Sequence, residues 1–234
     1  MNAKPNKNTK VLQTNKNNGM LITVIALIAV AVVVLGGVIW MAQSGGEANP
    51  ITFGETQDEL IEITDTGVMV VGEADAPTIQ IWEDFNCPGC GSLEGQNGEQ
   101  IATAVEAGDL RVEYHNLDFQ NPGSTSGEYS TRAIAAIQCV AAKDSLPVFF
   151  DVKNSYYANQ PAGGAGDLSA RELADLAEAA GANADTVECI SNVETNGGMD
   201  KASDTAENAQ RSIREAVGQV STPTVVFEGE QVEF

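Results

Sequence analysis

The amino-acid sequence predicts an α/β domain that follows a single membrane-spanning helix. Three observations lead to this fold class: an uncharged apolar run at residues 20–42, a strand–helix–strand pattern at 78–116, and a helical block that begins near residue 129. A helix between two strands favours a sheet with a parallel pair and a right-handed crossover. The chain has 234 residues, which is enough for one domain of ordinary size and an appendage.

The first 42 residues divide into a basic tail and an apolar run. Residues 1–19 carry four lysines and no acidic residue, and residues 20–42 carry no charge. At ~1.5 Å per residue this run spans the ~30 Å core of a bilayer, and the lysines predict a cytoplasmic N-terminus. A cleaved signal peptide is the alternative, but its apolar region usually has only about 7–15 residues. We therefore expect a single-pass signal anchor in the cell membrane, with the remaining chain outside the cytoplasm.

The rest of the chain is strongly acidic. The net charge is −21, and because the first 46 residues contribute four positive charges, the remainder carries −25. Nucleic acid is therefore not an expected partner, since binding to the phosphate backbone needs basic patches. The acidity is consistent with solubility and identifies no substrate.

Residues 43–66 are polar and contain glycine, which is typical of a linker, although the short apolar patch at 60–63 is compatible with a packed turn or strand. The folded domain is expected to occupy residues 67–234. The pattern predicts its first strands at 68–71, 78–82 and 110–116, with a helix between the last two.

A helical segment is expected at about residues 121–200, inserted after these strands. Its clearest helix start is the capping box of Ser169 and Glu172, which precedes an apolar stripe. A further long helix ends at Gly218, and a β-forming run at 224–227 and a turn follow it.

The strongest chemical signal is the Cys87-Pro88-Gly89-Cys90 motif, at the junction of the strand and the helix. Unpaired N–H groups and the macrodipole at a helix N-terminus favour an anion, so Cys87 is expected to be a reactive thiolate. Cys90 follows one turn later and can bridge back, which makes the pair a reversible dithiol/disulfide couple. Pro88 suits the first helical turn, where no N–H is needed.

Two structural alternatives to a redox site fit the sequence less well. A zinc knuckle needs two more ligands, and neither Cys139, Cys189 nor the single histidine, His115, stands at knuckle spacing. A purely structural disulfide in so short a loop gains little closure entropy. We therefore expect a redox pair with no metal and no cofactor, and we expect His115 to be an ordinary strand residue.

The remaining cysteines, Cys139 and Cys189, fall on apolar faces of predicted helices. In an oxidising compartment such a pair is expected to form a structural disulfide, and closing a 50-residue loop stabilises a domain by about 4 kcal/mol. Two buried free thiols are the alternative.

Pro223 stands directly before the β-forming run. A proline cannot donate to a central ladder, so it belongs at the strand start. A cis bond between Thr222 and Pro223 would present the backbone of Thr222 outward.

The run from Glu83 to Cys90, the helical insertion and the segment from Ser221 to Thr224 together resemble the DsbA-like branch of the thioredoxin superfamily. The resemblance covers about residues 67–234. It is strongest to membrane-anchored thiol–disulfide oxidoreductases of Gram-positive bacteria, particularly actinobacteria, and it implies a thioredoxin fold with a helical insertion.

The resemblance also implies roles for individual residues. Cys87 would be the exposed nucleophile, Cys90 the resolving cysteine and Pro223 a cis-proline facing their disulfide, while Thr222, Pro88 and Gly89 would contact an extended substrate. The implied reaction is the donation of a disulfide to reduced or unfolded exported proteins through a mixed disulfide. A quinone-linked membrane oxidoreductase is the implied redox partner.

Two departures from the family leave alternatives open. The dipeptide between the cysteines is Pro-Gly and lacks a thiolate-stabilising histidine, so a reductase or an isomerase of the same fold remains possible. The sequence also stops at Phe234, where relatives usually continue through the hairpin into a closing helix. In addition, Ile81 stands where a thioredoxin carries a buried acid, six residues before the first cysteine, whereas Glu83 and Asp84 match what the DsbA-like branch usually shows, and Glu83 is expected to act on Cys90. A non-catalytic chaperone or binding module with this fold is a further alternative.

Overall fold

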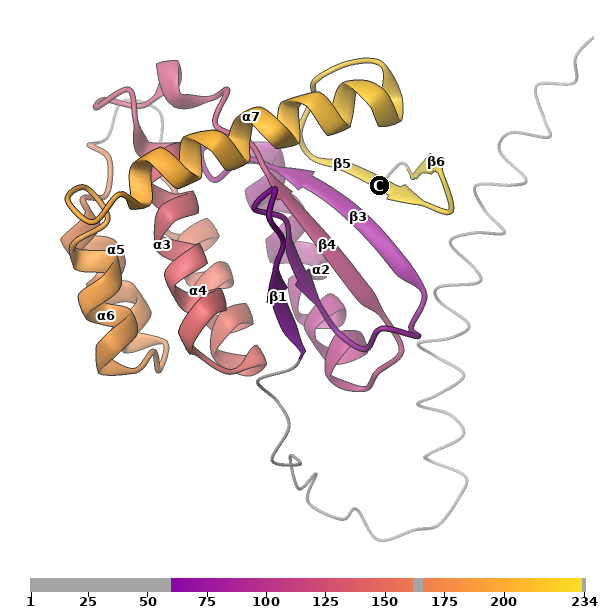
Figure 1. Cartoon of the computed structure of the whole chain (residues 1–234), viewed down its shortest axis with the longest axis horizontal. Coiled ribbons are helices and arrows are strands. Elements are labelled where there is room, and N and C mark those ends of the chain that lie inside the picture. The colour runs from indigo at the N-terminus through magenta and orange to yellow at the C-terminus, as the bar shows by residue number, and fades with distance from the viewer. Residues whose placement is uncertain (1–59, 162–165, 233–234) are drawn as a thin grey trace, which may run out of the picture. The chain divides into compact units, whose positions relative to one another are not determined.

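The computed structural model describes residues 60–161 and 166–232 (Figure 1). The predicted basic tail (1–19), membrane anchor (20–42) and most of the linker lie outside these residues, and they stay predictions. Among the residues that the structure describes, no helix combines the length and the apolar character needed to cross a bilayer.

A six-stranded sheet forms the framework, with the strand order β1-β2-β4-β3-β5-β6. The strands are β1 (Ile61–Ile63), β2 (Met69–Val71), β3 (Thr78–Glu83), β4 (Arg111–Asn116), β5 (Thr224–Phe227) and β6 (Glu230–Val232). β3 and β4 run parallel and every other neighbouring pair is antiparallel. Helix α2 (Pro88–Glu106) connects the parallel pair. The predicted strand–helix–strand unit is therefore confirmed, and it places the start of α2 directly after the central strand β3.

The sheet begins earlier than the predicted domain boundary at residue 67. Strand β1 pairs with β2 in the register Ile61 to Val71, and its two isoleucines pack against the main core. The apolar patch at 60–63 therefore forms the strand with which its pattern was compatible, inside the segment 43–66 that was expected to be a linker. Three residues are too few for the alternating pattern to be distinguished from a turn, and the strand is stabilised by pairing and packing.

The helices cover the two faces of the sheet unequally. After α2 come α3 (Tyr129–Lys143), α4 (Leu146–Ala158), α5 (Ala170–Ala179), α6 (Ala184–Ser191) and α7 (Gly198–Val217). The main core includes Ile81 and Tyr114 of the sheet and the apolar side chains of α3 and α4. A second, smaller core forms where Ile213 of α7 packs against Trp82 and Val226, and Figure 1 shows α7 passing across one end of the sheet.

The helical insertion between β4 and α7 consists of α3 to α6. Its predicted capping box is confirmed, because Ser169 Oγ accepts from the backbone N–H of Glu172 while the Glu172 carboxylate accepts from the Ser169 N–H. The capping box fixes the start of α5, which packs against α6. The insertion contributes Cys139 on α3 and Cys189 on α6.

Candidate active site

Cys87 lies at the N-terminal end of α2, where the chain leaves the central strand. It occupies the position before the first helical residue, and Pro88 follows it as the prediction required. The Cys87 N–H donates to the Asp84 carbonyl at 2.9 Å, which closes the turn between β3 and α2. Cys87 and Cys90 are both free thiols and are 5% and 1% exposed. The expectation that Cys87 is exposed is therefore wrong, because the loop before β5 lies against its sulfur. The fold thus places a nearly buried dithiol against the unpaired N–H groups of a helix start.

The surroundings of Cys87 favour its thiolate. A hydrogen bond from the Cys90 thiol, with further contributions from the backbone N–H groups of Cys90 and Gly89, outweighs burial and lowers the pKa of Cys87 from 9.0 to about 5. These donors lie within the first helical turn. At neutral pH the dithiol therefore carries a negative charge on Cys87.

The surroundings of Cys90 have the opposite effect. Burial, the hydrogen bond with Cys87 and the negative charges of Cys87 and Glu83 all raise the pKa of Cys90 well above its ordinary value. Cys90 therefore holds its proton at neutral pH. Two cysteines that are three residues apart differ in protonation, because Cys87 accepts hydrogen bonds in the first helical turn whereas Cys90 is buried beside negative charges.

The loop before β5 faces this dithiol. The Thr222–Pro223 peptide bond is cis, and the Thr222 carbonyl oxygen lies 3.4 Å from Cys87 Sγ. A Cβ on Gly89 would lie 3.0 Å from Pro223 Cδ and 3.7 Å from Cys87 Sγ, so glycine at this position permits the close approach of Pro223. The structure thus brings the predicted site residues Cys87, Cys90, Gly89, Thr222 and Pro223 together.

Asp84 is a buried polar residue beside the site to which sequence reasoning assigned no role. Its carboxylate accepts from the N–H of Asn86 at 2.9 Å, the N–H of Gln120 at 3.0 Å and the hydroxyl of Ser130 at 2.6 Å. Burial raises the pKa of Asp84 from 3.8 to about 6 in spite of these hydrogen bonds, and the charge of Cys87 adds to the rise. Asp84 therefore ties the turn before Cys87 to α3 and to the segment after β4.

A cluster of buried charges lies next to Cys90. Lys153 of α4 is fully buried, and its ammonium lies 3.2 Å from a Glu83 oxygen and donates a short hydrogen bond to Glu94. Asn116 donates to the other Glu83 oxygen at 3.2 Å, and the Lys153 ammonium lies 4.3 Å from the centre of the Tyr114 ring. Burial raises the pKa of Glu83, while Lys153 opposes that rise.

Glu83 was expected to act on Cys90, and the structure places its charge among those that raise the Cys90 pKa. Sequence reasoning missed Lys153 and Glu94. A signal for Glu94 is present, because it follows Cys90 by four residues and so lies on the same helix face. Lys153 likewise follows the buried Phe149 by four residues.

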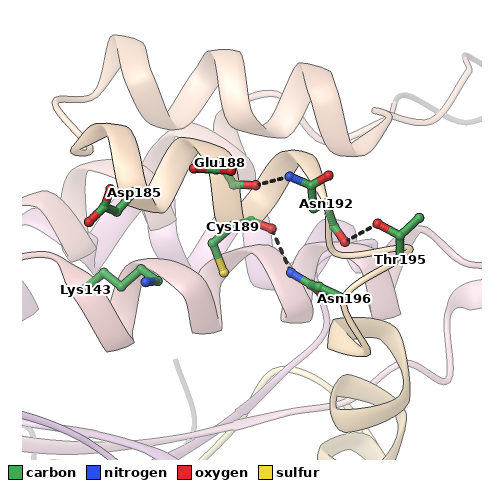
Figure 2. A pocket seen from close by; sticks show the side chains of 7 residues that line it. All are labelled: Lys143, Asp185, Glu188, Cys189, Asn192, Thr195 and Asn196. Carbon is green, nitrogen blue, oxygen red and sulfur yellow. Dashed lines mark hydrogen bonds between the residues drawn. The ribbon is translucent and has the colours of Figure 1, made fainter.

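The other two cysteines are joined by a disulfide. Cys139 and Cys189 have Cα atoms 5.9 Å apart and link α3 to α6 across 50 residues. Cys189 also lines an open pocket with Lys143, Asp185, Glu188, Asn192, Thr195 and Asn196 (Figure 2). None of the pocket's lining residues belongs to the Cys87 site, so the two cysteine pairs occupy separate places in the fold.

In the described part of the chain no group of three or more His, Cys, Asp or Glu side chains is arranged to hold a metal ion. The single histidine, His115, lies in β4 and stacks on Trp82 with ring centres 4.5 Å apart. Its surroundings are those of a packed strand residue under α7.

Comparisons with known proteins identify the family. The sequence model described as thioredoxin matches residues 64–234. The chain belongs to the thioredoxin family. The structure is similar to the thiol–disulfide oxidoreductase MdbA of Corynebacterium matruchotii, with a TM-score of 0.66 and 23% identity over 74% of this chain and 86% of that one. It is also similar to reduced DsbA of Mycobacterium tuberculosis, with a TM-score of 0.57 and 26% identity over 71% of this chain and 85% of that one.

The predicted DsbA-like member of the thioredoxin superfamily is therefore confirmed. MdbA and the DsbA of Mycobacterium tuberculosis are thus among the solved structures that share this fold. A stretch of 133 residues, 56% of the chain, is also 35% identical to the serine/threonine-protein kinase PknE of Mycobacterium tuberculosis. The chain spans about a quarter of that relative's length, since the match covers 24% of it.

Proposed function

We propose that this protein is an extracytoplasmic thiol–disulfide oxidoreductase that donates the Cys87–Cys90 disulfide to reduced exported proteins. The observation that carries the proposal is the asymmetry of the dithiol: Cys87 is stabilised as a thiolate, with a pKa of about 5, whereas burial keeps Cys90 a thiol. A stabilised thiolate favours the reduced protein, and so it favours passing the disulfide to a substrate.

The reaction proceeds in two exchanges. A substrate thiolate attacks Cys87 Sγ of the protein disulfide, the Cys87–Cys90 bond breaks, and Cys90 departs with the electron pair and takes up a proton. A second substrate thiolate then attacks the substrate sulfur of this mixed disulfide and releases Cys87 as a thiolate. The substrate loses two electrons and gains a disulfide, and the protein gains two electrons and becomes a dithiol.

Buried groups favour the protonated state of Cys90 after the first exchange. The negative charge of Glu83 acts on Cys90, and burial raises the pKa of Glu83 itself. Lys153 limits this rise and keeps the buried carboxylates paired.

Backbone groups around Cys87 are suited to hold an extended substrate. The Thr222 carbonyl lies 3.4 Å from Cys87 Sγ, and Pro88 and Gly89 begin α2 next to Cys87, with Gly89 close to Pro223. Such contacts recognise a chain by its backbone, which fits unfolded substrates of varied sequence. The predicted anchor at residues 20–42 would hold the domain at the outer face of the membrane, near a quinone-linked oxidoreductase that restores the disulfide.

A second function in the same class is favoured by the Pro-Gly dipeptide. It supplies no histidine next to the Cys87 thiolate, so the couple could be more reducing than that of a strong oxidant. In that case the protein is a reductase or an isomerase, and electrons flow from Cys87 to substrate disulfides.

The first experiment is the equilibrium of the Cys87–Cys90 couple of the purified chain against glutathione. A potential between about −120 and −180 mV supports disulfide donation or isomerisation, and one near −270 mV supports a reductase. Cys87→Ala should abolish the oxidation of a reduced substrate protein, while Cys90→Ala should accumulate the mixed disulfide. If the chain shows no reversible couple, and Cys87→Ala does not change the rate at which the substrate protein is oxidised, the protein is a non-catalytic binding module.

A further inference from the structure

The side chain of Gln160 reaches the active-site turn from the helical insertion. Gln160 follows the end of α4, and its amide nitrogen donates to the carbonyl oxygens of Phe85 at 2.8 Å and Cys87 at 3.0 Å. The Phe85 ring also stacks on Tyr157 of α4, with ring centres 4.8 Å apart. The end of α4 therefore holds the turn both by hydrogen bonds and by packing.

Gly91 leaves the space that Gln160 occupies. A Cβ at position 91 would lie 2.3 Å from Gln160 Oε1 and 3.1 Å from its amide carbon. The backbone N–H of Gly91 donates to the Cys87 carbonyl at 3.2 Å, so this oxygen accepts from both Gly91 and Gln160. The Gln160 side chain therefore occupies the space beside Gly91, and a larger residue at position 91 would displace it. We call this packing the Gln160–Gly91 contact.

The start of α2 needs such external support. Its sequence contains Gly89, Gly91, Gly95 and Gly98, and glycine is the poorest helix former after proline. No side chain caps the helix at Cys87. A helix start with weak intrinsic preference takes its geometry from the contacts made to it.

We propose that Gln160 is a positioning residue that holds the Cys87 carbonyl and the first turn of α2 in the geometry needed for thiol–disulfide exchange. The proposal rests on the proposed function of the Cys87–Cys90 pair. The N–H groups of Gly89 and Cys90 stabilise the Cys87 thiolate only while the first turn is closed around Sγ. Gln160 fixes the carbonyl on the other side of the same turn, and through it the helical insertion adjusts the reactivity of Cys87.

The test compares Gln160→Met with the wild type. Methionine has about the length of glutamine and cannot donate to the two carbonyls. We expect the Cys87 pKa, measured as the pH dependence of iodoacetamide alkylation, to rise by about one unit, and the equilibrium with glutathione to shift about tenfold toward the protein disulfide. The matched control is Gln96→Ala, because Gln96 is exposed and its amide donates to the Ser92 carbonyl on the solvent side of α2.

A double-mutant cycle tests the fit between the two positions. Gly91→Ala alone should raise the Cys87 pKa, because its Cβ displaces Gln160, whereas in the Gln160→Ala background the same change should have little effect. If Gly91→Ala changes the Cys87 pKa equally in both backgrounds, the Gln160–Gly91 contact has no part in setting that pKa.

Two results would overturn the positioning role itself. One is a Gln160→Met protein whose Cys87 pKa and glutathione equilibrium match those of Gln96→Ala. The other is a Gln160→Met protein with a lower unfolding temperature and unchanged thiol chemistry, which would make Gln160 purely structural. Alkylation needs no turnover, so a chain without a reversible couple would refute the proposed function while the pKa comparison still decides the role of Gln160.

Discussion

The two cysteine pairs of this protein show how position in the fold decides what a pair of thiols does. Cys87 and Cys90 are three residues apart in a single helical turn, and they remain free thiols with pKa values shifted in opposite directions. Cys139 and Cys189 are 50 residues apart on two helices and are joined covalently. The first pair lies at a helix start, where backbone N–H groups stabilise the thiolate of Cys87 in the reduced protein.

The second pair differs in what its bond constrains. A Cys87–Cys90 bond closes a loop too short to restrict the unfolded chain strongly, whereas the Cys139–Cys189 bond closes a long one. Opening the first therefore changes the charge of a site, and opening the second changes the entropy of the unfolded chain. The first pair therefore serves reactivity and the second serves stability.

The largest expected effect on stability comes from the second pair. Cys139→Ala/Cys189→Ala should lower the free energy of unfolding by about 4 kcal/mol in the chain-entropy model, measured by urea denaturation. The Cys87 pKa and its equilibrium with glutathione should stay at the wild-type values, because Cys87 Sγ contacts Cys90 and Thr222 and neither of them lines the pocket at Cys189. A shift of the glutathione equilibrium in this double variant would show that the Cys139–Cys189 disulfide also affects the reactivity of Cys87.

Much of this comparison could be predicted from the sequence. The spacing of Cys87 and Cys90 and their place between a strand and a helix indicated the reactive pair. The proline before a strand indicated a strand start, and the family resemblance implied that this proline faces the pair. The cysteine spacing and the proline before the strand are local signals, since each depends on residues within one turn of the chain. The helices and the parallel strand pair were predicted for the same reason.

What the sequence did not reveal depends on tertiary contacts. Lys153 and Glu94 act beside Cys90 only because α4 packs on α2, and their four-residue spacing from Phe149 and Cys90 indicates a shared helix face without showing that the two charges pair. Gln160 reaches the turn before Cys87 from 73 residues away in the sequence. Strand β1 is too short for its alternation to be read, and it exists because β2 pairs with it.

The second effect concerns the charge beside the reactive pair. Burial raises the pKa of Asp84 from 3.8 to about 6, so the protonated carboxyl is the form that the fold favours. The contribution of the protonated Asp84 to the free energy of unfolding is therefore complete below pH 3.8. About 3 kcal/mol of this contribution is lost as the pH rises through 6. Asp84→Asn does not titrate, so the stability difference between wild type and variant should change by that amount across this pH range.

The redox state of Cys87 provides a control for this titration. The Cys87 charge is one cause of the raised Asp84 pKa, and the disulfide form carries no such charge. Urea denaturation of the oxidised protein should therefore show a smaller change, with its midpoint at lower pH. A stability difference between wild type and Asp84→Asn that is constant from pH 3.8 to 7 would contradict a titrating buried carboxyl at this position.

The smallest effect tests whether the helical insertion near the disulfide acts only as a scaffold. Ser169→Ala removes the hydroxyl that accepts from the Glu172 N–H at the start of α5, and it should lower the free energy of unfolding by about 1 kcal/mol. Ser169→Thr keeps a hydroxyl at the cap and should retain most of the stability. Neither substitution should alter the alkylation rate of Cys87. A changed rate in Ser169→Ala would mean that α5 reaches the reactive pair through α4, with which it packs, and that stability and reactivity are not separable in this fold.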